Sequence, residues 1–215
     1  MSDKRQASVT GQVVPRMSRD DEQKLIVRAR RGNADAFRAI VEAYQDRLFA
    51  FVWRMLRNHH EAEDVCQTAF VKAYESLASY SNKYAFSTWL FTIAYRLCLN
   101  SIRKKKPISG NIDFSYIGSK AESAEVVLAN SEEARRLRKT IWAAVDKLTP
   151  AQKSAVLLFY RESKSCEEIG QVLDMPAVTV KSHLHRARAK LRENLSGELV
   201  HDWMAIEFLA DSHTA

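Results

Sequence analysis

Apolar residues recur every three or four positions along most of this chain, the spacing that places them on one face of an α-helix. In the first half, this period predicts four helices, at about residues 18–31, 35–57, 61–77 and 87–105. Ser18, with an acid three residues later, is a typical helix start, and Asn58 is expected to end the second helix. Four such helices share one core, so we expect a helical domain of about 90 residues over 18–106.

A second helical group is predicted from residue 131 onward. Two helices lie on either side of the Leu-Thr-Pro sequence at 148–150, and Ser165 with Glu168 forms a capping box that opens a short helix. A tight turn at 174–175 then leads into a final basic, amphipathic helix. A short helix, a turn and a basic helix are typical of a helix-turn-helix DNA-binding domain, which we assign to residues 131–195.

Three segments lack this period. Residues 107–130 contain Pro, Gly and many Ser residues, and from 107 to 133 one Lys stands against five acidic residues. This composition predicts a flexible acidic linker between the two domains. Residues 1–17 are expected to be a disordered extension. The C-terminal extension, 196–215, has apolar residues at helical spacing, and it either packs back onto the second domain or docks a partner.

Composition agrees with an all-α protein, since the 215 residues include only six Gly and four Pro. The net charge of +7 favours a polyanionic partner. Three widely spaced cysteines form no disulfide framework, no secretory signal is recognised, and no run of 18 apolar residues indicates membrane insertion. We therefore expect a reduced, cytoplasmic protein.

The final helix, from about Thr179 to Glu193, combines one apolar seam with a basic surface. The first half of such a helix enters the major groove, where its outward side chains contact base edges. The outward residues here are Lys181, Ser182, His185 and Arg186. Arg188 and the later cations suit phosphate contacts. The alternative is a solvated charged face that binds nothing, but the short helix and turn before it favour DNA.

Catalytic and metal-binding patterns receive little support. No Ser-His-Asp arrangement, Gly-rich phosphate loop or paired carboxylates stand out, so we expect neither an enzyme nor a cofactor. His60 and Asp64 are one helical turn apart, yet the remaining ligands of a metal site are unspecified, so no metal is assigned.

Taken together, these segments resemble the extracytoplasmic-function group of bacterial RNA polymerase sigma factors. DAFRAIVEAYQDRLFAFVWRML, HEAEDVCQTAFVKAY and FSTWLFTIAYRLCLNSIRKKK resemble the sigma-2 domain of that family. LTPAQKSAVLLFY, EEIGQVLDMP and TVKSHLHRARAKLRE resemble its sigma-4 domain. The resemblance covers about residues 20–106 and 132–194. It implies two helical domains, with sigma-4 reading the minus-35 element and sigma-2 reading and melting the minus-10 element.

The resemblance also implies partners. The AED-x-x-Q helix of the family binds the clamp helices of the polymerase β′ subunit, and sigma-4 binds the β flap. The matching polymerase-binding residues are Glu61, Asp64, Gln67 and Glu75. Without the family pattern, an ordinary solvated face would be the simpler interpretation. An anti-sigma factor is the further partner that the resemblance implies.

Promoter melting requires cations along the backbone and a pocket for an unstacked base. The resemblance assigns this role to Arg96, Asn100 and Arg103, which share one helical stripe, and to the loop 79–86. In the loop, Asn82 and Lys83 are expected as polar readers and Tyr80, Tyr84 and Phe86 as pocket walls, with Trp89 in the core. Arg96 stands where the family often has Asn, and Val178 where it often has Gly.

Two other classes of protein remain open from the sequence. A self-sufficient regulator would bind a palindromic operator without polymerase. An adaptor would use its basic face for another acidic partner, with salt sensitivity but no sequence preference.

Overall fold

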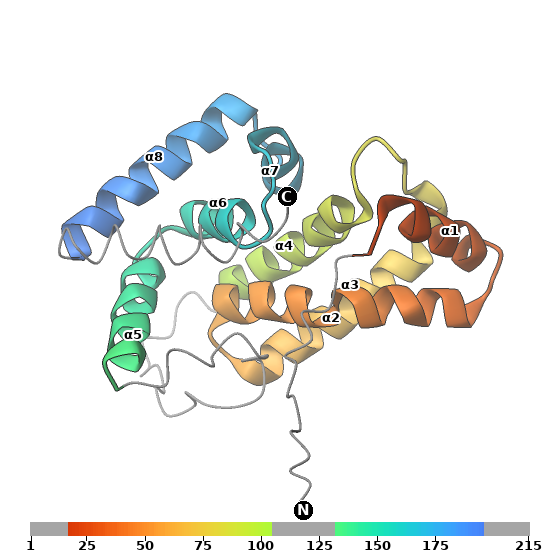
Figure 1. The fold of residues 1–215 in the computed structure, drawn as a ribbon, viewed down its shortest axis with the longest axis horizontal. Coiled ribbons are helices and arrows are strands. Elements are labelled where there is room, and N and C mark those ends of the chain that lie inside the picture. Colours follow the sequence, from red (N-terminus) through yellow and green to blue (C-terminus); the bar gives the residue numbers. More distant parts are fainter. Residues whose placement is uncertain (1–16, 105–131, 196–215) are drawn as a thin grey trace, which may run out of the picture.

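The structure is a computed structural model that describes residues 17–104 and 132–195 (Figure 1). In these two ranges all regular structure is helical, which confirms the all-α expectation. The N-terminal group comprises α1 (Arg19–Arg30), α2 (Ala34–Leu56), α3 (His59–Glu75), the 3₁₀ turn η1 (Leu77–Ser79) and α4 (Phe86–Lys104). The C-terminal group comprises α5 (Glu132–Asp146), α6 (Pro150–Tyr160), α7 (Cys166–Leu173) and α8 (Ala177–Asn194). The expected linker, the C-terminal extension and the N-terminal extension up to residue 16 lie outside the described residues.

Local capping sets the helix boundaries of the N-terminal group. The Ser18 side chain accepts a hydrogen bond from the backbone of Asp21, as predicted. Asn58 was expected to end α2 but instead caps α3, because its side-chain oxygen accepts the N–H of Glu61 at 3.0 Å. Arg57, with a φ of 55°, ends α2 in its place. A short polar side chain thus serves the helix that follows it.

The helix-turn-helix of the C-terminal group forms as the sequence predicts. Ser165 and Glu168 make the capping box at the start of α7, and Asp174 ends that helix in the left-handed region at a φ of 56°. Gly170 lies where α7 meets the turn, and a Cβ built on it would come within 2.6 Å of the carbonyl oxygen of Met175. Only glycine fits this close approach, so the turn depends on it.

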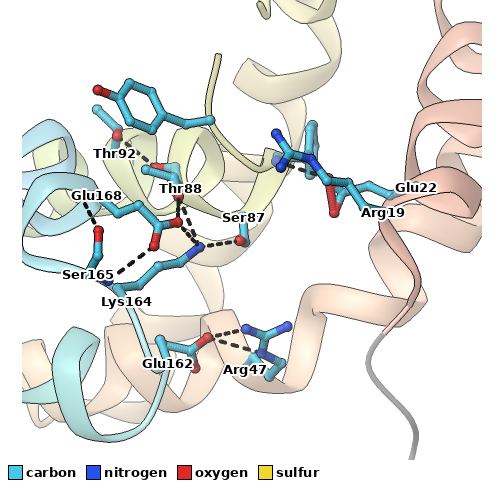
Figure 2. Close-up of polar contacts among 12 residues, drawn as sticks. Arg19, Glu22, Arg47, Ser87, Thr88, Thr92, Glu162, Lys164, Ser165 and Glu168 are labelled. Carbon is cyan, nitrogen blue, oxygen red and sulfur yellow. Dashed lines mark hydrogen bonds and ion pairs between the residues drawn. The ribbon is translucent and has the colours of Figure 1, made fainter. Parts of the chain in front are cut away.

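The two groups of helices pack against each other, with α7 against α4 and α6 against α2 (Figure 1). An ion pair and hydrogen bonds join the groups across this contact (Figure 2). Arg47 of α2 donates from Nε to Glu162 at 3.0 Å and makes a second contact through its terminal nitrogen. Lys164, only 7% exposed, donates to Ser87 at 2.7 Å and to Thr88 at 2.9 Å, at the start of α4.

Glu168 completes this cluster from α7. Its carboxylate accepts hydrogen bonds from the Lys164 ammonium at 2.9 Å, the Thr88 hydroxyl at 2.8 Å and the Ser165 backbone at 3.1 Å (Figure 2). Burial alone would raise the pKa of Glu168, but these hydrogen bonds outweigh it, so the pKa lies below its ordinary value. The charged form of Glu168 is therefore the one that the contact stabilises.

Further contacts join the C-terminal end of α2, together with its capping residue Arg57, to the other group. The Arg54 guanidinium lies 3.0 Å from the ring centroid of Trp142, and Arg57 Nε lies 3.3 Å from the carboxylate of Asp146. Ser154 lies against Met55, with its Oγ 3.2 Å from the sulfur. The contact between the groups is thus rich in polar and charged pairs, as is common between domains that move relative to each other.

Candidate nucleic-acid interface

The seam of α8 faces its own group of helices and leaves a polar face outside. Val180, Leu184, Ala187 and Leu191 are all buried. The four residues predicted to contact bases are all exposed, namely Lys181, Ser182, His185 and Arg186. The structure therefore gathers these four side chains on one open face of the second helix of the helix-turn-helix.

Arg188 lies differently from the other predicted residues of α8. It is half-buried, and its Nε donates to the hydroxyl of Tyr160 at 2.8 Å. Its guanidinium also lies 5.8 Å from the ring centroids of both Phe159 and Tyr160 on α6. Arg188 therefore holds α8 against α6, an effect that the helical period did not reveal.

The loop before α4 differs from the expected open pocket. Tyr80 is 4% exposed and Phe86 is fully buried, so neither of these predicted pocket walls is accessible to a base in this structure. Their rings pack edge to face at 5.5 Å, both lie against the half-buried Trp89, and the Tyr80 hydroxyl donates to the carbonyl of Tyr84 at 2.8 Å. Exposing large aromatic rings to water is unfavourable, so these rings pack against one another instead of lining an open pocket.

What remains accessible in the loop is its tip. Asn82 and Lys83 are exposed and Tyr84 is half-buried. The Lys83 ammonium lies 5.6 Å from the centroid of the Tyr84 ring. A nucleotide approaching this loop would therefore meet an amide, a cation and one half-buried aromatic ring.

Helix α1 positions the loop, an effect that the sequence pattern did not indicate. Arg30 donates to the carbonyl of Leu77 at 3.0 Å and also to that of Tyr80. Glu22, 5% exposed, accepts the backbone N–H of Phe86 at 3.0 Å and thereby caps α4. No local pattern signals these contacts, because each joins residues almost fifty or more positions apart.

The stripe on α4 is open, as predicted. Arg96, Asn100 and Arg103 are all exposed. Arg96 and Asn100 also line an open groove of about 430 Å³ between α3 and α4, together with Lys72, Glu75, Ser76, Ile93 and Leu97. This groove brings one cation and one amide of α4 next to the end of the predicted polymerase-binding helix.

That helix, α3, presents a mixed face. Asp64, Gln67 and Glu75 are exposed, whereas Glu61 is half-buried and its carboxylate accepts a hydrogen bond from Ser101 of α4 at 3.2 Å. Val71, 56% exposed, lies on the same face between Gln67 and Glu75. An acidic and amide face around one apolar side chain suits a basic, partly apolar partner helix.

One group of possible metal ligands lies at the start of α3. Ligand atoms of His59, His60 and Glu63 lie within 4.8 Å of one another. However, the side chain of His60 is 94% exposed and that of Glu63 is 48% exposed, so no surrounding structure fixes them as ligands. Separately, none of the helices in the described ranges is long and apolar enough to cross a membrane.

A helix-turn-helix with an open basic face, beside a helical bundle with a second basic stripe, defines an all-α nucleic-acid-binding protein. The sigma-70 region 2 family matches residues 40–108, and the sigma-70 region 4 family matches residues 138–191. The ECF RNA polymerase sigma factor SigW of Bacillus subtilis is 36% identical over 183 residues, which cover 80% of this chain and 96% of that protein. The chain therefore belongs to the extracytoplasmic-function (ECF) group of sigma-70 factors, which are initiation factors and not enzymes.

Other relatives agree with this assignment. The ECF RNA polymerase sigma-E factor of Escherichia coli K12 is 30% identical over 174 residues, covering 78% of this chain and 90% of that protein. Among solved structures, CnrH in complex with the cytosolic domain of CnrY has a TM-score of 0.60 at 22% identity, covering 81% of this chain and 96% of that one. The sigma factor RpoE of Bartonella quintana, in complex with the anti-sigma factor NepR, has a TM-score of 0.53 at 22% identity, covering 84% and 99%. These two structures share the fold.

Proposed function

We propose that this protein binds core RNA polymerase and directs it to promoters. The C-terminal group of helices reads the minus-35 element through α8, and the N-terminal group reads and helps to melt the minus-10 element through α4 and the loop tip. The observation that carries this proposal is the exposure of three separate faces, on α3, α4 and α8, in a chain of the ECF group. A regulator acting alone would need only the face on α8.

The division of labour follows the chemistry of each face. On α8, Lys181 and Arg186 suit guanine O6 and N7, while Ser182 and His185 suit bases or phosphates. On α4, Arg96, Asn100 and Arg103 suit the backbone and bases at the upstream fork, with Asn82, Lys83 and Tyr84 on the loop tip. Tyr80 and Phe86 support that loop from the core and reach DNA only if the loop rearranges.

On α3, Asp64 and Gln67 are the centre of the proposed polymerase contact, with Glu75 at its edge. Glu61, which is tied to Ser101, contributes from the side. We further propose an anti-sigma factor as regulator, as the NepR complex has for its own sigma factor, and a cytoplasmic site of action, where polymerase and promoters are found.

A run-off transcription assay with purified protein, bacterial core polymerase and a promoter library tests the proposal. Asp64→Arg should abolish specific transcripts because it reverses the charge at the centre of the polymerase contact. Asp46→Arg is the matched control, an exposed acid of α2 outside the three faces, and it should transcribe like the wild type. Absence of wild-type transcripts, together with tight binding of the lone protein to a palindrome, would show a self-sufficient regulator instead.

A further inference from the structure

Val178 is a large apolar side chain that the fold leaves in water. It is 70% exposed, the highest value among the large hydrophobic residues of the described ranges. It is the second residue of α8, at the end of the helix that enters the major groove in a helix-turn-helix. Burial in the core therefore does not account for a β-branched side chain at this position.

Val178 shares a face of α8 with four exposed polar residues. Counting from it, the residues at i+3, i+4, i+7 and i+8 are the exposed Lys181, Ser182, His185 and Arg186. This spacing places all five on one helical face. The Ser182 hydroxyl donates to the carbonyl of Val178 at 3.1 Å, which binds the first turn of α8 to the second. Val178 thus continues the DNA-reading face toward the N-terminus of the helix.

The chemistry of this face identifies what an apolar side chain can read. Thymine is the base that presents a methyl group in the major groove, and apolar side chains contact that group directly. Lys181 and Arg186, which follow along the same face, suit guanine edges in the same groove, so the major groove of DNA can accommodate the valine and its charged neighbours together. An apolar protein partner would instead bury Lys181 and Arg186 without compensating charge, which is unfavourable.

We propose that Val178 is a specificity-determining residue that reads a thymine in the minus-35 element, by apolar contact between its γ-methyl groups and the thymine 5-methyl group. The inference rests on the proposed function, because it requires α8 to bind the minus-35 element. It adds a recognition of thymine to the hydrogen-bonding residues already assigned to this face.

Removal of single methyl groups from the DNA tests the contact. Each thymine of the minus-35 element, on either strand, is replaced in turn by deoxyuridine, which lacks only the 5-methyl group. Initial run-off rates of the full-chain holoenzyme are measured at limiting promoter concentration for the wild type, Val178→Ala and Val178→Thr. Val27→Ala, at an exposed valine of α1, is the matched control. Thermal melts of each variant establish that the fold is retained.

The wild type should lose roughly fourfold in rate at one deoxyuridine position, as expected for one methyl group removed from an apolar contact. Val178→Ala should lose a similar factor on the unmodified promoter and show no further loss at that deoxyuridine. Val178→Thr, which keeps one γ-methyl group, should fall between the two, and Val27→Ala should behave like the wild type.

The inference is overturned if the wild type responds to no deoxyuridine, or if Val178→Ala responds to every one as the wild type does. It is also overturned if Val178→Ala weakens transcription equally with and without a minus-35 element, since Val178 then contacts polymerase. Failure of the wild type to transcribe any promoter is a different result, which refutes the proposed function itself.

Discussion

At the scale of single residues, Gly170 shows how one missing side chain permits the helix-turn-helix. We expect Gly170→Ala to lower the free energy of unfolding by about 1–3 kcal/mol, because the new Cβ would overlap the backbone of Met175. Gln171→Ala, at the exposed next position of α7, should change it by less than about 0.5 kcal/mol. Urea unfolding followed by circular dichroism measures both, and equal stability of the two variants would contradict this account.

The three cysteines should differ in reactivity. Burial raises the pKa of the Cys66 and Cys98 thiols to about 12 each, so both are protonated and shielded at pH 8. Cys166 is only half-buried. Iodoacetamide should therefore modify Cys166 of the folded protein at least about tenfold faster than the other two. Peptide mass spectrometry measures the rates; labelling in urea, where all three thiols should react alike, is the control.

At the scale of elements, α8 has an outer face for DNA and an inner anchor to α6. Arg188→Lys keeps the charge but loses the stacking on Phe159 and the hydrogen bond to Tyr160. We expect a loss of about 1 kcal/mol in the free energy of unfolding. Arg192→Lys, at an exposed position of the same helix, is the matched control and should leave stability unchanged. If both variants unfold alike, Arg188 does not anchor α8.

At the scale of the whole molecule, the packing of the two groups against each other limits the distance between two DNA elements that the protein can contact at once. A compact chain of 215 residues has a radius of gyration of about 17 Å. The names of the minus-35 and minus-10 elements place them about 25 base pairs apart. At about 3.4 Å per base pair, this is about 85 Å along the duplex. Under the proposed function, the two groups of helices would therefore have to separate before α8 and α4 could occupy both elements. The 27 residues between Lys104 and Glu132 are enough to span about 90 Å when extended.

Lys164 offers a way to open this arrangement. Lys164→Glu places a second carboxylate beside Glu168 and between Ser87 and Thr88, where the two charges repel each other. We expect the radius of gyration from small-angle X-ray scattering to rise by several ångströms while helical circular dichroism is retained. Lys190→Glu makes the same charge change at an exposed site and should stay compact. An unchanged radius for Lys164→Glu would show that this cluster does not hold the groups together.

The same cluster predicts a dependence on pH. The folded pKa of Glu168 lies below its ordinary value of 4.5, so its contribution is present above that pH and is lost as the pH falls through the lowered value. Glu168→Gln should therefore cost most stability at neutral pH and progressively less below about pH 4.5. Urea unfolding of both proteins across pH 3 to 7 measures the difference. A difference that stays constant with pH would exclude this role.

The sequence alone determined the helices, the helix-turn-helix and the outward residues of α8. These features depend on local rules, namely the helical period, capping boxes and turn residues, which act within a few positions of the chain. The predicted seam of Val180, Leu184 and Ala187 is buried accordingly. Family motifs are local in the same sense, which is why the ECF resemblance could be recognised from short segments.

Only the tertiary structure decided which side chains of irregular segments are buried and how the two groups of helices meet. Tyr80 and Phe86 carry no period, so their burial depends on Trp89 and on contacts from α1. Likewise, Lys164 and Glu162 are charged residues, a type that is ordinarily exposed to solvent. They are buried because Ser87, Thr88 and Arg47, from distant parts of the chain, supply the hydrogen bonds and charges that make burial tolerable. Pairings across such distances depend on the packing of whole helices, which no local pattern encodes.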